Sequence, residues 1–207
     1  IIRNKPAIEN WNNNATINKE SLKKFLVPKQ FNYNTLLNQL SKLPEQAGRD
    51  LSGVVLNALE ENFNFFGVTS DVGPSTKAVI SKSEYFSADN RAGRNIHFGI
   101  REHAMGSICN AMALYGGFRV FDSTFMAFSN YMLPALKMRA MMNAPVLSVF
   151  THDSIDIGED GPTHQPIEQL SQIRSLVGLN VFRPANEVEM VAAYKFFVEQ
   201  KKPTALV

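Results

Sequence analysis

From Arg49 onward the sequence alternates between short strand-like segments and amphipathic helical segments, and this alternation restricts the fold more than any other feature. The strand-like segments are short and apolar, and they lie at 64–70, 96–100, 118–121, 145–151, 180–183 and 204–207. Helical periodicity fills the intervals at 50–62, 102–115, 126–142, from Pro166 to about 177, and 187–200. Strands separated by helices form parallel sheets that helices cover on both faces. The sequence therefore predicts an α/β fold, with three α/β/α layers around a mostly parallel six-stranded sheet.

Residues 1–45 differ in composition from the rest of the chain. They are rich in Asn and Lys, include Asn12–Asn14, and show little periodicity before a possible short helix at 33–40. Such a polar segment buries too little apolar surface to order itself. We interpret residues 1–45 as a linker or N-terminal extension and residues 46–207 as one α/β domain. The chain begins at Ile1 and ends within a strand-like segment, which is typical of a piece of a longer protein.

Composition argues against several classes of function. The 21 basic and 19 acidic residues give a net charge of +2, which is too small to indicate a nucleic-acid partner. The single cysteine, Cys109, excludes an internal disulfide and favours a reducing compartment, so we expect a cytoplasmic protein. No run of about 18 apolar residues occurs, so no membrane span is expected.

The loop at 158–166, Gly-Glu-Asp-Gly-Pro-Thr-His-Gln-Pro, is the strongest candidate for an active site. Glycine and proline interrupt regular structure there. Together with the end of the preceding strand, the loop gathers two histidines and two carboxylates: His152, His164, Glu159 and Asp160. Loops at the carboxyl ends of parallel strands commonly bind ligands. Metal binding is the less favoured interpretation, because no tight ligand spacing such as H-E-x-x-H is present.

Glu102 lies at a strand-to-helix junction and allows two interpretations. As a first-turn acid it would simply interact favourably with the helix dipole. Alternatively it is a buried carboxylate that shares a proton with a ligand.

Two other groups of side chains are also ambiguous. Phe125, Phe128 and Tyr131 recur at three-residue steps. Such a stripe is either part of the core or a wall on which a flat heteroaromatic ring stacks. Asp71 and Ser75 follow the first strand, where they would stabilise a turn or contribute to a site.

Four motifs together resemble the transketolase family, specifically its central pyrimidine-binding domain. They are Gly-Ile-Arg-Glu-His-Ala-Met-Gly at 99–106, Ser-Thr-Phe at 123–125, Thr-His-Asp-Ser at 151–154 and the loop at 158–166, in the family's order. The resemblance covers roughly residues 49–207. It implies the pyrimidine module of the thiamin diphosphate-binding fold. It also implies a transferase of the pentose phosphate pathway, which moves a two-carbon ketol unit from phosphorylated ketoses to aldoses.

The resemblance assigns cofactor roles to several residues. Glu102 matches the acid that meets N1′ of the thiamin aminopyrimidine. Phe128 matches the aromatic residue that stacks on this ring, with Phe125 and Tyr131 lining the pocket. Asp71 matches a structural acid beside it.

The resemblance assigns substrate roles to five further positions. Arg49, Ser75 and His152 match residues that hold the substrate phosphate, while Asp160 and His164 match residues that meet substrate hydroxyls. His164 is also a candidate for catalysis, beside the acid described above. Arginine and serine donors suit phosphate oxygens, and a carboxylate suits a hydroxyl.

The family's first domain, which holds the diphosphate and Mg²⁺ or Ca²⁺, is absent from this sequence. The family's Ser-Arg-Gln-Asn segment beyond the last strand is absent as well. The resemblance implies a homodimer in which the diphosphate-binding domain of the second subunit completes the site, so the isolated chain is expected to be inactive. Two alternatives remain open, namely a dihydroxyacetone synthase-like thiamin enzyme and a non-catalytic partner domain.

Overall fold

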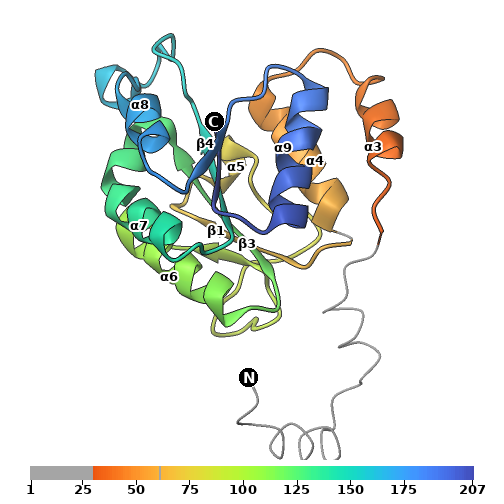
Figure 1. Ribbon diagram of the computed structural model, residues 1–207, viewed down its shortest axis with the longest axis horizontal. Helices are drawn as coiled ribbons and strands as arrows, with labels where there is room; N and C mark the ends of the chain where they lie inside the picture. The colour runs from red at the N-terminus through yellow and green to blue at the C-terminus, as the bar shows by residue number, and fades with distance from the viewer. Residues whose placement is uncertain (1–29, 61) are drawn as a thin grey trace, which may run out of the picture.

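The computed structural model describes residues 30–60 and 62–207, and a six-stranded sheet forms its centre. The strands are β1 (Phe65–Thr69), β2 (Asn95–His97), β3 (Arg119–Phe125), β4 (Val146–Thr151), β5 (Asn180–Phe182) and β6 (Thr204–Leu206). Their spatial order is β2-β1-β3-β4-β6-β5, and every neighbouring pair is parallel. The predicted parallel sheet is confirmed (Figure 1).

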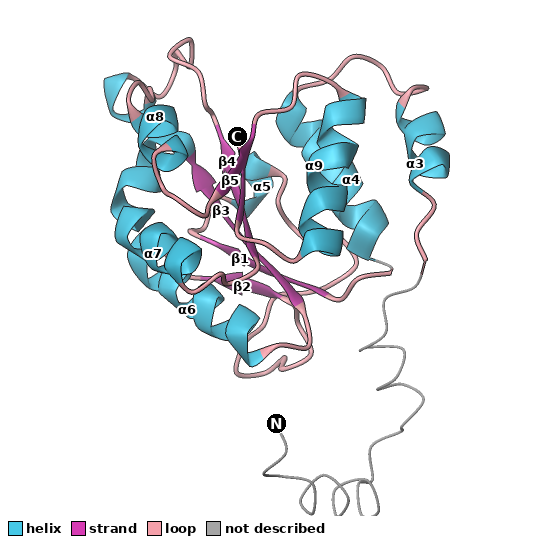
Figure 2. Cartoon of the chain, viewed as in Figure 1, coloured by secondary structure: helices cyan, strands magenta, loops and turns pink. Residues whose placement is uncertain are grey.

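Helices cover both faces of this sheet (Figure 2). One layer contains α3 (Tyr33–Leu40), α4 (Gly48–Glu60) and α9 (Glu187–Gln200), and the other contains α6 (Glu102–Tyr115), α7 (Ser129–Met141) and α8 (Gln169–Arg174). Side chains alternate along a strand. Accordingly, Leu147 and Val149 of β4 pack into the first layer, whereas Val146 and Phe150 pack into the second. The predicted three-layer architecture is therefore confirmed.

Four element boundaries differ from the sequence-based expectation. β3 continues to Phe125 instead of ending at 121, because it pairs with β4 from Val120 up to the Phe125–Thr151 pair. The following helix consequently starts as a 3₁₀ turn, η2 (Met126–Phe128), before α7. β2 ends at His97, and Gly99 then turns the chain with a φ of +67°, a conformation that glycine adopts without strain. The helix after Pro166 is also shorter than expected.

The expected short helix at 33–40 is present as α3 and packs on the domain. The Asn32 side chain accepts a hydrogen bond from the Thr35 backbone N–H at 3.1 Å, which caps its first turn. Leu36 and Leu40 are buried in the core shared with α4 and α9. The Asn-rich segment lies within residues 1–29, outside the described residues. Within the described part of the chain, no helix is long and apolar enough to cross a membrane.

A buried ion pair joins α6 and α7 to the sheet. Arg139 of α7 and Asp122 of β3 are both fully buried and bonded to each other. The same guanidinium donates to the Asn110 side-chain oxygen at 2.7 Å and to the Gly106 carbonyl at 3.3 Å, both on α6. It also donates to Ser148 of β4. One charged side chain thus fixes α6 relative to three other elements.

Candidate active site

The crevice between β1 and β3 is where the sheet presents its main pocket. The chain leaves β1 toward β2 on one side and leaves β3 toward β4 on the other, which makes this crevice the topological switch point. Ligands of open α/β sheets bind there, beyond the carboxyl ends of the strands. A pocket of about 860 Å³ opens at this place. Five residues singled out from the sequence line it, namely Glu102, Phe125, Phe128, Tyr131 and His164.

Glu102 is the first residue of α6 and is only 5% exposed. Within the described residues, its carboxylate has no hydrogen-bond or ion-pair partner, yet its oxygens are not among the fully buried side-chain atoms that lack one. They therefore reach the surface of the pocket, where a ligand can form a hydrogen bond with them.

The aromatic stripe forms one wall of this pocket. Phe125 ends β3, Phe128 lies in η2 and Tyr131 belongs to α7. The ring centroids of Phe125 and Phe128 are 6.1 Å apart, with an interplanar angle of 19°. Tyr131 is 66% exposed, and His164 meets the Phe128 ring edge-on at 5.0 Å. The stripe lines a cavity instead of filling the core, so it offers faces for stacking a flat ring.

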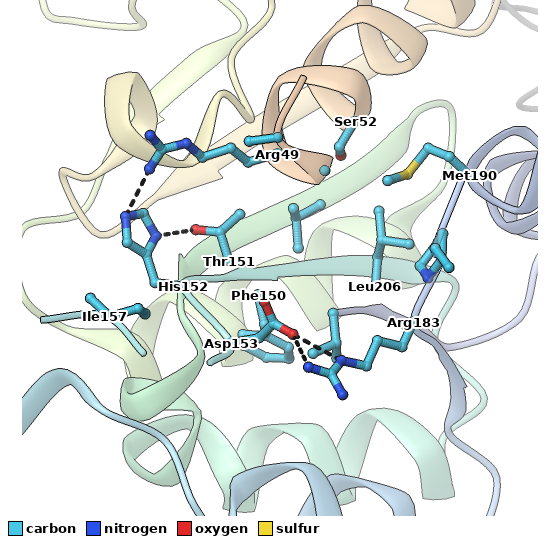
Figure 3. Close-up of a pocket in the computed structure, with 16 residues that line it drawn as sticks. Arg49, Ser52, Phe150, Thr151, His152, Asp153, Ile157, Arg183, Met190 and Leu206 are labelled. Atoms are coloured by element: carbon cyan, nitrogen blue, oxygen red, sulfur yellow. Dashed lines mark hydrogen bonds and ion pairs between the residues drawn. The ribbon is translucent and has the colours of Figure 1, made fainter. Parts of the chain in front are cut away.

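A second pocket of about 620 Å³ lies above the carboxyl ends of β4, β6 and β5 (Figure 3). Arg49 and His152 line it. The His152 ring contacts the Phe125 ring at a tilt of 32°, with centroids 3.8 Å apart, and Phe125 also lines the first pocket. The contact between these two rings therefore joins the walls of the two pockets.

The tautomer of His152 follows from its two hydrogen-bond partners. Arg49 Nη1 lies 3.0 Å from His152 Nε2, and an arginine can only donate, so Nε2 accepts. The proton of the neutral ring is then on Nδ1, 2.8 Å from the Thr151 hydroxyl oxygen. Burial lowers the pKa of the His152 imidazole, and the Arg49 charge lowers it further. The carboxylates of Asp160 and Asp153 act in the opposite direction.

Asp153 and Arg183 form another part of the second pocket's wall (Figure 3). The guanidinium donates from Nε at 2.9 Å and from Nη2 at 2.7 Å to the same oxygen, Oδ2 of Asp153. Asp153 follows β4 and Arg183 follows β5, so the pair spans the end of β6, which lies between them. The sequence analysis assigned a role to neither residue, although Asp153 lies in the Thr-His-Asp-Ser motif at 151–154. The position of each just after a strand is a signal for the single residues, but not for their pairing.

The structure places three of the predicted residues outside the lining of both pockets. Asp71 has a φ of +64°, and its Oδ1 accepts a hydrogen bond from the Gly99 N–H at 3.0 Å. The same oxygen lies 3.1 Å from His97 Nδ1, so Asp71 holds the turn that leads into α6. Ser75 is exposed in the short helix α5 (Gly73–Thr76). Asp160 is exposed in the loop before η3 (Pro162–His164).

Comparison with known proteins agrees with this architecture. Residues 45–207 match the family model described as "Transketolase, pyrimidine binding domain". The chain belongs to the transketolase family. It is 50% identical over 163 residues to a transketolase of Halalkalibacterium halodurans, covering 78% of this chain and 24% of that protein.

Solved transketolase structures show the same fold. The transketolase of Campylobacter jejuni superimposes with a TM-score of 0.82 at 40% identity, covering 98% of this chain and 31% of that one. The transketolase of Pichia stipitis in complex with sedoheptulose 7-phosphate gives a TM-score of 0.75 at 35% identity, covering 80% of this chain and 26% of that one. This member of the transketolase family thus spans about a quarter of the length of the curated relatives it matches.

Proposed function

We propose that this chain supplies the aminopyrimidine-binding half of a transketolase active site. The whole enzyme would transfer a two-carbon ketol unit between phosphorylated sugars in the cytoplasm. The observation that carries the proposal is Glu102, a carboxylate 5% exposed and without a partner among the described residues, which lines the pocket at the switch point. An aromatic wall accompanies it in the same pocket.

The residues of the first pocket fit the aminopyrimidine of thiamin diphosphate. Phe128 offers a face for stacking, with Phe125 and Tyr131 beside it. When bound, thiamin diphosphate supplies a nucleophilic thiazolium carbon that accepts the two-carbon unit. Glu102 would share a proton with N1′ of the ring, which is general acid–base work for a positioned carboxyl group.

The remaining parts of the cofactor would be held by a partner. Within the described residues, no group of three or more His, Cys, Asp or Glu side chains is placed to hold a metal ion. We assign the diphosphate and its Mg²⁺ or Ca²⁺ to the first domain of a second subunit in a homodimer. In that arrangement Asp71 would keep its structural role beside the cofactor, at the turn before α6.

The second pocket would receive the phosphate of the sugar. Arg49 and His152 already meet there, and a guanidinium is well suited to phosphate oxygens. The related Pichia stipitis enzyme was solved with a phosphorylated ketose, sedoheptulose 7-phosphate. Ser75 would complete the phosphate contacts once the substrate is bound. Asp160 and His164 would meet the sugar hydroxyls, with His164 close enough to the aromatic wall to take part in catalysis.

Substitution Glu102→Gln in the full-length enzyme tests the proposal. Glutamine keeps the shape but cannot share a proton with N1′, and loss of one positioned acid–base group typically costs about 10² to 10⁴ in rate. The fold is expected to persist, because the change removes a buried charge without creating one. The measurement is hydrogen–deuterium exchange at the thiazolium C2, followed by NMR after acid quench.

Glu187→Gln is the matched control, because Glu187 is a first-turn acid of α9 that lines neither pocket. We expect this variant to exchange at the wild-type rate. If the Glu102 variant also exchanged C2–H at the wild-type rate, Glu102 would be an ordinary first-turn acid and the proposed role would be lost.

A further inference from the structure

The ion pair between Arg183 and Asp153 has no role in the function proposed so far. Both side chains line the second pocket together with Arg49 and His152. They are 48% and 32% exposed, respectively. Exposed ion pairs contribute little to the stability of a fold. Stability therefore does not account for the place of this pair in the pocket wall.

Asp153 is the one acidic side chain among the described residues that line this pocket. A bare carboxylate there would repel a phosphate dianion. Arg183 directs both Nε and Nη2 at one oxygen of that carboxylate, so its charge is committed to Asp153. The pair as a whole is neutral, and the positive charge that remains in the pocket is that of Arg49.

The same pair holds the chain beside a strained residue. His152 has a φ of +55°, a left-handed conformation that non-glycine residues adopt only where their surroundings hold them. Its ring is held by Arg49 and Thr151, and the next residue along the chain is Asp153. The Arg183 guanidinium, which follows β5 on the other side of β6, bonds to that residue (Figure 3).

We propose that Arg183 is a positioning residue for phosphate recognition. It neutralises Asp153 and anchors it against the pocket wall, so that an incoming phosphate meets Arg49 without an unpaired carboxylate among the residues that line the pocket. The pair thereby contributes to selectivity for phosphorylated over unphosphorylated sugars. This inference rests on the phosphate-binding role proposed above for Arg49 and His152.

A double-mutant cycle in the full-length enzyme tests the inference. The variants are Arg183→Met, Asp153→Asn and the double substitution, each assayed with a phosphorylated aldose acceptor and with its unphosphorylated analogue. For Arg183→Met we expect the ratio of the two KM values to shift about tenfold against the phosphorylated acceptor. This is the scale of a contact between a unit charge and a dianion in a water-like dielectric. The double substitution should return the ratio to within about threefold of wild type, because no charge is left to neutralise.

Arg183→Lys is a gentler variant that keeps the charge, and we expect it to stay near the wild-type ratio. Arg174→Met is the matched control, because Arg174 is exposed in the last turn of α8 and does not line the pocket. A double substitution as impaired as Arg183→Met would overturn the inference, since Arg183 would then act on the phosphate directly. An equal change in both KM values would overturn it as well.

A parallel Arg49→Met variant separates this inference from the proposed function. If that variant discriminates against the phosphorylated acceptor while Arg183→Met does not, only the role of Arg183 is wrong. If neither variant discriminates, the phosphate site itself is wrong.

Discussion

At the scale of single residues, the two hydrogen bonds of His152 set its tautomer, while burial and neighbouring charges shift its pKa. The Arg49 guanidinium occupies Nε2, and burial together with the Arg49 charge lowers the pKa of the ring. Between that lowered pKa and the unfolded value of about 6.5, the unfolded chain binds more protons than the folded one. His152 therefore contributes stability that is fully present above about pH 6.5 and is lost as the pH falls through the folded pKa.

Removing the Arg49 charge should raise the pKa of His152. In Arg49→Met the imidazolium no longer faces a neighbouring positive charge, and the opposing charges of Asp160 and Asp153 remain. We expect the ring to titrate below 6.5 in the wild-type protein and at a higher pH in the variant. The measurement is a pH titration of the ring signals by heteronuclear NMR. An unchanged midpoint would show that Arg49 does not control this ring.

Residues that lie in recognisable motifs could be predicted from the sequence, whereas their partners could not. The motifs indicated His152 and Glu102, and the structure places each in the wall of a pocket. Arg183 and Asp153 are 30 residues apart in the chain. They meet only because β4 and β5 both pair with β6, on its two sides, so that their carboxyl ends lie close together. No local sequence pattern predicts this strand order.

At the scale of elements, Arg139 links α7 to α6, β3 and β4 through fully buried bonds. Arg139→Met would leave the Asp122 carboxylate buried without its cation, and breaking a buried pair in this way typically costs about 3–5 kcal/mol. We expect the free energy of unfolding, measured by urea denaturation at neutral pH, to fall by that amount.

Substituting both partners of this pair provides the control. Asp122→Ala combined with Arg139→Met removes the stranded charge, so it should be less destabilising than Arg139→Met alone. The opposite order would mean that the pair contributes packing and not charge compensation.

Helical periodicity located the main helices, but sheet pairing decided where strands end. The sequence pattern predicts that β3 stops at 121, yet pairing with β1 continues to Ser123 and pairing with β4 continues to Phe125. Phe125 therefore lies at the carboxyl end of β3, where its ring contacts His152. The buried role of Arg139 could not be predicted from the sequence either. A basic residue in the last turn of a helix is normally explained by its favourable interaction with the helix dipole.

At the scale of the whole molecule, the chain contains the pocket proposed for the pyrimidine and spans about a quarter of its relatives' length. We expect the isolated chain to fold, to bind thiamin diphosphate weakly and to show no transketolase turnover. The diphosphate and metal normally supply charge-assisted bonds that this chain would lack. Calorimetric titration with thiamin diphosphate measures the binding, and a steady-state assay measures the turnover. Turnover by the purified chain alone would contradict the division of the site between two domains.

The order β4-β6-β5 also has a consequence for synthesis on the ribosome. β5 pairs only with β6 among the described strands, and β6 is the last strand of the described chain. When residues 180–182 leave the ribosome, their partner Thr204–Leu206 has not yet followed them out. The strand that precedes Arg183 therefore stays unpaired until α9 and β6 have emerged as well. The nascent polypeptide can complete the wall of the second pocket only after β6 has emerged. If synthesis stalled before that point, the edge of β4 that pairs with β6 would be exposed to neighbouring polypeptide chains.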